Sequence, residues 1–389
     1  MKDFNVFQPV EVKFGCRRIN EIGEVVSKIG ERCILVSGPI SDYKKPILAK
    51  IQEALTNKDV ELKYFHGVVQ NPTTDSVTSG AEMAREFKAE VVIGLGGGSS
   101  IDSAKTIAVE ATHSGNSWDY LFYKETQPTE KTLPIIAIPT TSGTGSHINQ
   151  AAAISNTKEK RKSGIGSPYL FPKVSIVDPE LMLTLPEHIT ASTGFDVFAH
   201  SFETYIHKNA SPYTDLVAIE AIRLVIENLP KLIRDGSDLE ARSQMAWADT
   251  LAGFCLANVG VGLPHSLGMA IGGCCPHVMH GKALALVYPE FIRYTYSSSV
   301  KKFANLARLF DKNLENESDD IAAERSSLLL DDFLNVIKIG LSLKKLEIPE
   351  TELEEIAEKS MELPDYTNNP RIANLEEINN MLKSIKNKN

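Results

Sequence analysis

The pattern of apolar residues changes once along this chain of 389 residues, near Pro186. Before that point, short apolar runs alternate with amphipathic stretches, which predicts a mainly parallel sheet covered by helices on both faces. Beyond residue 190 no run is typical of a strand, and apolar residues recur at the 3.6-residue spacing of helices. The expected strands are residues 33–38, 91–96, 133–138 and 174–177, with helices at 45–55 and 76–87; the later helices are 195–206, 215–227, 239–256, 300–310, 322–339 and 351–361.

This change predicts an α/β domain over residues 1–183 and an all-helical domain over residues 184–389, each of ordinary domain size. The formal net charge of −9 disfavours non-specific binding to nucleic acid, which needs a clustered basic surface. The start of the chain lacks the pattern of a signal peptide, and no apolar run approaches the roughly 20 residues that span a bilayer. Five mostly scattered cysteines fit reduced thiols, so we expect a cytoplasmic protein with no membrane partner.

A glycine-rich turn, with Gly96, Gly97 and Gly98, directly follows the expected strand at 91–96. We expect a helix to begin there, with Ser99 as its N-cap residue and Asp102 completing a capping box. Glycines let the backbone approach a phosphate, and the free N–H groups of a helix start favour negative charge. A tight turn without any ligand would use the same residues, so this turn alone leaves both interpretations open.

A second polar loop follows the expected strand at 133–138. It carries the hydroxyl groups of Thr140, Thr141 and Thr144, together with two more glycines. Ligands of open α/β sheets bind at the carboxyl ends of the strands, where both loops would lie. Although an ordinary loop could have this composition, two such loops after two buried strands favour a nucleotide site.

Acidic and imidazole side chains recur in the helical half. Asp196 and His200 are four residues apart, which places them on one face of a helix, and His265, His277 and His280 follow in an apolar, glycine-rich region. One carboxylate with two or three imidazoles suits Fe²⁺ or Zn²⁺ and leaves a position open for substrate. Taken singly, each histidine could instead be a satisfied core or surface residue, and the first pair a simple hydrogen bond.

Together these segments resemble the iron-containing (group III) alcohol dehydrogenase family, from Phe14 to about Tyr294. The resemblance implies a dinucleotide-binding α/β domain followed by an all-helical metal domain, the dehydroquinate synthase-like fold. It also implies hydride transfer between NAD(P)(H) and a small alcohol or aldehyde, by a homodimer or larger homo-oligomer. The matching motifs are Asn71-Pro72-Thr73, Gly96-Gly97-Gly98-Ser99, Pro139-Thr140-Thr141-Ser142-Gly143-Thr144, Asp178-Pro179-Glu180-Leu181, Thr193-Gly194-Phe195-Asp196 with His200, and His280-Gly281.

Carried over residue by residue, the resemblance implies two sets of ligands. The metal, Fe²⁺ with Zn²⁺ as the alternative, would be held by Asp196, His200, His265 and His280. The dinucleotide would be contacted by Gly38, Asn71, Gly96, Gly97, Gly98, Ser99, Thr140, Thr141, Thr144 and Lys162.

Gly38 bears on the choice of dinucleotide. NAD-preferring members often carry Asp at this place, where it hydrogen-bonds the ribose 2′-hydroxyl. Without that carboxylate, and with Lys44 and Lys45 nearby in sequence, we expect NADP(H) to be favoured slightly over NAD(H).

The chain departs from the family pattern at three places. Met269 stands four residues after His265, where members often have a histidine that relays a proton, and His277 is the candidate catalytic substitute. His280 follows His265 by 15 residues, one more than in common members, so His277 is also a rival metal ligand. His147 replaces the usual glutamate after the threonine loop, with no effect that the sequence defines.

Two other functions fit parts of the pattern. A lyase of the dehydroquinate synthase type would share the fold and a metal site, but it needs extra cations for its charged substrate, and the segment from His265 to His280 is followed by Lys282 alone. A nucleotide-binding protein without catalysis would explain Met269, but not the four retained candidate ligands.

Overall fold

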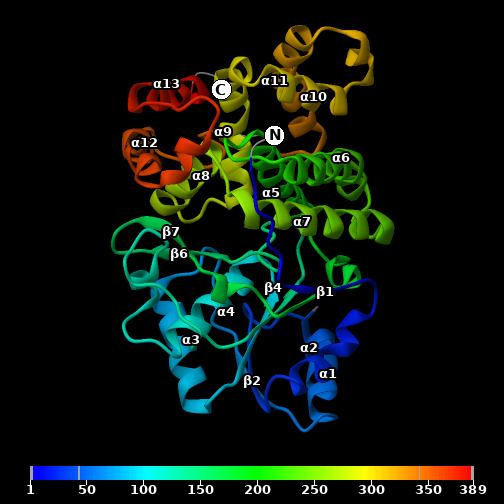
Figure 1. Ribbon diagram of the computed structural model, residues 1–389, viewed down its shortest axis with the longest axis vertical. Helices are drawn as coiled ribbons and strands as arrows, with labels where there is room; N and C mark the ends of the chain where they lie inside the picture. Colours follow the sequence, from blue (N-terminus) through cyan, green and yellow to red (C-terminus); the bar gives the residue numbers. More distant parts are fainter. Residues whose placement is uncertain (1–2, 43, 341, 387–389) are drawn as a thin grey trace. The chain divides into compact units, whose positions relative to one another are not determined.

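The computed structural model describes residues 3–42, 44–340 and 342–386. They form two compact units, one of Phe7–Leu185 and one that runs from Pro186 onward and includes the start of the chain (Figure 1). Each unit has a hydrophobic core of its own. The predicted combination of a parallel-sheet domain and a helical domain is confirmed.

The first unit is built on a parallel sheet. In the described ranges its six strands follow the order β1-β8-β5-β4-β2-β3, and every adjacent pair is parallel. A separate antiparallel pair, β6 and β7, lies outside this sheet. The strands are β1 (Glu11–Phe14), β2 (Arg32–Val36), β3 (Glu61–Phe65), β4 (Val91–Gly96), β5 (Ile135–Pro139), β6 (Ala151–Asn156), β7 (Arg161–Gly166) and β8 (Val174–Val177); the helices are α1 (Ile22–Ser27), α2 (Lys44–Thr56), α3 (Thr74–Phe87) and α4 (Gly98–Glu110).

Helices cover both faces of this sheet, as its continuous apolar strands require. Along β2, Ile34 and Val36 pack into the core that contains residues of α3 and α4, whereas Cys33 and Leu35 pack into the core that contains residues of α1 and α2. Because β5, β4 and β2 are neighbours with the same direction, the loops that follow them meet at one edge of the sheet.

Among its described residues, the second unit contains helices and no strand. The six predicted helices are confirmed, with ends shifted by up to eight residues, and α8, α9 and α13 were not expected. The helices are α5 (Glu187–Ile206), α6 (Pro212–Arg234), α7 (Leu239–Val259), α8 (Leu263–Cys274), α9 (His280–Thr295), α10 (Val300–Phe310), α11 (Asp319–Val336), α12 (Leu353–Glu362) and α13 (Leu375–Lys386).

Helix α5 is the central element of this unit and is buried along most of its length. Phe195, Phe198 and Phe202 form one stripe along it, with ring centroids 5.5 Å and 6.1 Å apart between successive members. Tyr288 of α9 packs edge-on against the first two of these rings. The helix is thereby held on a rigid aromatic core.

No single helix among the described residues combines the length and apolar character needed to cross a bilayer; only the bent pair α7 and α8 meets those criteria when the two are taken together.

Candidate metal and nucleotide sites

Helix α5 carries three polar side chains on one face. Asp196, His200 and Glu203 are spaced four and three residues apart, so they lie one above another. All three are buried in the helical unit. A close approach of α6 fixes the helix just before Asp196, because a Cβ at Gly194 would lie 2.5 Å from Cδ1 of Leu229. The three buried polar side chains of α5 need polar partners.

The first turns of two further helices each place a histidine at this face. His265 is the third residue of α8, and His280 is the first residue of α9. Helix α9 can start here only because the next residue is glycine: a Cβ at Gly281 would lie 1.9 Å from the carbonyl oxygen of Ser192 in α5. The glycine of the His280-Gly281 motif therefore lets the backbones of α9 and α5 touch.

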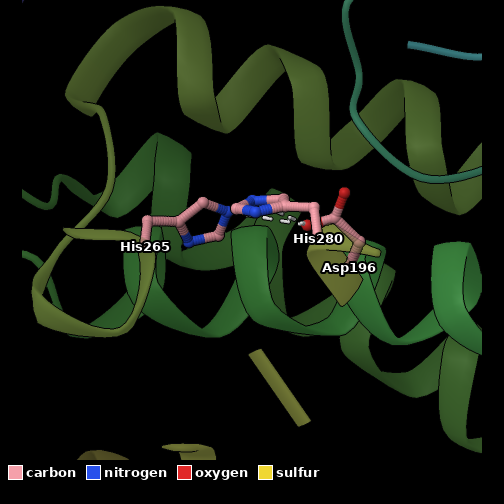
Figure 2. A group of neighbouring side chains, drawn as sticks. All are labelled: Asp196, His265 and His280. Atoms are coloured by element: carbon pink, nitrogen blue, oxygen red, sulfur yellow. Dashed lines mark ion pairs between the residues drawn. The ribbon is translucent and has the colours of Figure 1, made fainter. Parts of the chain in front are cut away.

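Asp196, His265 and His280 form the centre of this cluster. Their ligand atoms lie within 4.8 Å of one another, and Figure 2 shows the three side chains converging from their separate helices. Oδ1 of Asp196 is 3.5 Å from Nε2 of His265 and 4.0 Å from Nε2 of His280. One oxygen and two imidazole nitrogens at such separations match the donors that Fe²⁺ and Zn²⁺ take.

The electrostatics of the cluster favour a bound cation. Burial alone would raise the pKa of Asp196, but the imidazoles of His200 and His265 outweigh it and hold that pKa at about 2. Burial alone would lower the pKa of His265, but the carboxylates of Glu203 and Asp196 outweigh it and raise that pKa to about 10. Because metal ions and protons compete for such nitrogens, the same carboxylates attract a divalent ion.

Two buried atoms of the cluster fit a metal directly. Oδ1 of Asp196 and Nε2 of His265 are buried without a hydrogen-bond partner among the residues that the structure describes. Leaving two such atoms unsatisfied would cost free energy, which coordination of an ion removes. The residues present therefore fit a divalent metal, whose bound form would explain both atoms.

Glu203 contacts both the ring and the backbone of His265, and the sequence analysis did not identify it. Its Oε1 lies 2.7 Å from Nδ1 of His265, and its Oε2 accepts the backbone N–H groups of Gly262 and His265 at 2.9 Å and 3.3 Å. The available signal was its spacing from Asp196 and His200 along the same helix.

The other candidate residues of this unit lie beside the cluster or away from it. His200 is outside the three-residue group, although its Nδ1 is 3.5 Å from Oδ1 of Asp196 and its ring centroid is 4.3 Å from that of His265. His277 is exposed, and its Nε2 lies 3.0 Å from the carbonyl oxygen of Leu346. Met269 lies one turn after His265 along α8 and is half-buried.

In the α/β unit, the glycine turn connects β4 directly to α4. The N-cap residue is Gly97 and the helix begins at Gly98, so the prediction that Ser99 is the N-cap is wrong. Asp102 does not form a capping box either: it is buried and accepts hydrogen bonds from Oγ of Ser146 at 2.6 Å and from the backbone N–H of Ala153 at 3.0 Å. A side chain at residue 98 would collide with Thr144, so the residue that begins this helix is glycine.

The threonine loop lies against this turn. The backbone N–H of Thr140 donates to the carbonyl of Gly96 at 2.9 Å. A Cβ at Gly97 would lie 3.0 Å from Oγ1 of Thr141, and a Cβ at Gly98 would lie 2.4 Å from Cγ2 of Thr144. Glycine at both positions is thus required for the two loops to approach each other. The two loops form a small backbone cradle at the start of α4, and such a cradle suits a phosphate.

Asn71 and Lys162 form a buried pair in the same unit, with Nζ of Lys162 2.9 Å from Oδ1 of Asn71. Asn71 has a left-handed backbone, with φ of 53°. Burial raises the pKa of Asp102, while the charges of Lys105 and Lys162 oppose that shift. The charge of Lys162 thus acts on Asp102, which lies in the first half of α4.

Lys105 and His147 are buried near the threonine loop. Lys105 donates to the carbonyl oxygens of Asn149 and Ala151 at 2.8 Å and 2.7 Å, and burial lowers its pKa to about 7. Burial, with a further contribution from the charge of Lys105, lowers the pKa of His147 to about 3, so its imidazole is neutral. Sequence reasoning did not identify Lys105, whose position on α4 shows no local signal for this tertiary contact.

Gly38 follows β2 by two residues, at the same sheet edge as the glycine turn. A Cβ placed there would lie 3.4 Å from Nζ of Lys44 and 3.5 Å from the carbonyl oxygen of Val68. The ammonium group of Lys44 is thus the nearest neighbour of a side chain placed at this position.

Comparison with known proteins covers both units. The family model "Iron-containing alcohol dehydrogenase" matches residues 9–179, and the model "Fe-containing alcohol dehydrogenase family, C-terminal" matches residues 190–386. The choline dehydrogenase of Bacillus subtilis (strain 168) is 33% identical over 96% of this chain and 93% of that protein. The NAD-dependent methanol dehydrogenase of Bacillus methanolicus is 30% identical over 98% of this chain and 99% of that protein.

Solved structures agree with this match. An archaeal halo-thermophilic alcohol dehydrogenase from a Red Sea brine pool superposes with a TM-score of 0.93 at 34% identity, covering 99% of this chain and 100% of that one. With family models over both halves and relatives aligned over nearly the whole length, the chain belongs to the iron-containing alcohol dehydrogenase family.

Proposed function

We propose that this protein is an alcohol dehydrogenase or aldehyde reductase that transfers a hydride between a nicotinamide dinucleotide and a small alcohol or aldehyde, with a divalent iron held by Asp196, His265 and His280. The observation that carries the proposal is the convergence of these three ligand atoms within 4.8 Å of one another. We include His200 as a fourth ligand, since its Nδ1 lies 3.5 Å from Oδ1 of Asp196. Zn²⁺ is the alternative ion, because the same donors suit it.

Residues of the helical unit would hold the metal, and residues of the α/β unit would bind the dinucleotide. Lewis-acid polarisation of the substrate oxygen is the chemistry that a divalent ion supplies when bound, and hydride exchange is what the dinucleotide supplies. Asp196 would contribute the negative charge that holds the ion, and the buried surroundings would exclude water. Gly97, Gly98 and Ser99 would bind the pyrophosphate through backbone N–H groups, and the threonine loop would orient the nicotinamide half.

We further propose that NADP(H) is slightly favoured over NAD(H). Gly38 presents no carboxylate to repel a 2′-phosphate, and Nζ of Lys44 lies close to the position of its missing side chain. The relative from Bacillus methanolicus is named for NAD, and the ratio of kcat/KM for NADPH to that for NADH measures the preference of this chain.

Family membership favours this activity over the lyase and the non-catalytic alternatives. A small alcohol or aldehyde is the proposed substrate class, in keeping with the choline and methanol that the relatives are named for. Assembly into a homodimer or larger, a cytoplasmic location and a catalytic role for His277 stay predictions.

The activity is tested by absorbance at 340 nm. Protein purified without oxygen and loaded with Fe²⁺ or Zn²⁺ is mixed with a panel of small alcohols and NAD⁺ or NADP⁺, and in reverse with aldehydes and the reduced forms. We expect metal-dependent turnover with at least one pair. Equal rates for the loaded protein and for Asp196→Asn would contradict the proposal.

A further inference from the structure

Glu203 makes two kinds of contact in the helical unit, one with the backbone at the start of α8 and one with the ring of His265. It lies on α5 with its side chain buried, and it reaches the first turn of α8. Its Oε1 is 2.7 Å from Nδ1 of His265. Its Oε2 accepts the backbone N–H groups of Gly262 and His265.

The contact with the backbone replaces an N-cap. Helix α8 has Gly262 in the N-cap position, and a glycine has no side chain to accept the free N–H groups of the first turn. The carboxylate of Glu203 accepts them from another helix, and its negative charge also suits the positive end of the α8 dipole. Glu203 therefore holds in place the first turn of α8, which carries His265.

The contact with the ring decides which nitrogen of His265 is available. A carboxylate accepts hydrogen bonds only, so it requires the proton of a neutral His265 to be on Nδ1. The lone pair is then on Nε2, which is the atom 3.5 Å from Oδ1 of Asp196. The ring and its tautomer are thus both fixed by one side chain.

We infer that Glu203 is a positioning residue for the metal site: through His265 it sets the affinity of the ion without touching the ion itself. This inference rests on the proposed metal site. Outer carboxylates that accept from a ligating histidine typically change metal affinity by about 10- to 100-fold when they are removed.

The test compares the Co²⁺ affinity of metal-free wild-type protein with that of Glu203→Gln, read from the visible d–d absorption of Co²⁺. A glutamine can keep the backbone contacts through its carbonyl oxygen, but it then presents an NH₂ group to Nδ1 of His265 and favours a proton on Nε2. We expect a Kd for Co²⁺ that is about 10- to 100-fold higher. Melting of the metal-free protein reports whether the fold is retained.

Glu110→Gln is the matched control. Glu110 is as buried as Glu203 and also accepts two hydrogen bonds, from Oγ1 of Thr78 at 2.6 Å and from the backbone N–H of Ser117 at 2.8 Å, but it lies in the α/β unit. Its substitution should leave the Kd for Co²⁺ unchanged. If both variants weaken Co²⁺ binding equally, the effect is a general loss of stability and the inference is overturned.

Failure of the inference differs from failure of the proposed function. If wild-type protein and Asp196→Asn bind Co²⁺ equally, there is no metal site at Asp196 and the proposed function fails. If wild type binds through Asp196 and Glu203→Gln binds equally well, only the inference fails. Should Glu203→Gln not fold, Glu203→Asp keeps the charge but shortens the reach: weaker Co²⁺ binding supports positioning, and unchanged binding overturns it.

Discussion

Oδ1 of Asp196 and Nε2 of His265 lie 3.5 Å apart, although the residues are 69 positions apart in sequence and belong to different helices. Both atoms are buried, and neither has a hydrogen-bond partner in the described part of the chain. A divalent ion bound between the two atoms would satisfy both of them. The predictions below follow from a divalent ion in that position and a dinucleotide on the glycine turn.

Asp196→Asn should remove the metal and the activity together. The amide has no net charge to offset the desolvation of a divalent ion, so metal content should fall below about one tenth of wild type and kcat/KM by at least about 1,000-fold. Elemental analysis and absorbance at 340 nm measure the two effects.

Asp215→Asn is the control for this substitution, because it removes a carboxylate of the same unit that pairs with Lys302 at 2.8 Å. It should retain the metal. Retention of one ion per chain by Asp196→Asn would show that the ligand assignment is wrong.

Gly98→Ala should weaken dinucleotide binding while the metal site stays intact. The added Cβ would lie 2.4 Å from Cγ2 of Thr144, so the threonine loop must move, at a cost of about 1–3 kcal/mol. We expect the Kd for NADPH or NADH, measured by fluorescence, to rise about 10-fold or more.

Gly164→Ala is the matched control in the same unit, since its Cβ would meet neighbours only at 3.6 Å and 3.8 Å, which is ordinary contact. An unchanged Kd in Gly98→Ala would mean that the dinucleotide does not use this cradle.

Gly38→Asp should shift the preference toward NAD(H). The new carboxylate would repel a 2′-phosphate and would lie next to Lys44, so the ratio of kcat/KM for NADPH to that for NADH should fall about 10- to 100-fold. Gly38→Asn tests shape without charge and should change the ratio far less. If the two variants shift the ratio equally, bulk rather than charge at this position controls the choice.

Stability of the metal-free protein should fall as the pH rises from about 6.5 to about 10. The pKa of His265 is about 10 in the folded protein against an ordinary 6.5, so its contribution is complete below 6.5 and is lost as the folded form deprotonates. The loss is up to about 5 kcal/mol in the free energy of unfolding.

Guanidinium unfolding of EDTA-treated protein at pH 6 and pH 9 measures this loss, and His265→Gln should show much less of it. The same pH dependence in wild type and His265→Gln would assign the loss to other groups.

The sequence predicted the combination of a parallel-sheet domain and a helical domain, and it paired candidate site residues that share one element. Asp196 and His200 could be paired because four residues make one helical turn. Helix α8 was missed because it is glycine-rich and buried on nearly all sides, so it lacks the alternation of apolar and polar residues that marks a surface helix.

Tertiary contacts explain what the sequence could not predict. The N-cap of α4 is Gly97 rather than Ser99, beside a glycine that packs closely against Thr144, and Glu203 accepts a hydrogen bond from the turn at Gly262. Both partners come from distant parts of the chain, and spacing within a segment carries no information about them.

Anomalous diffraction at the iron absorption edge, from crystals grown without oxygen with Fe²⁺ and dinucleotide, tests the central claim most directly. The account predicts one strong peak within about 2.0–2.2 Å of Oδ1 of Asp196, Nε2 of His265 and an imidazole nitrogen of His280. A peak only at the second group of candidate ligand atoms, on Cys274, Glu352 and Glu355, or no peak at all in protein that turns over, would contradict it.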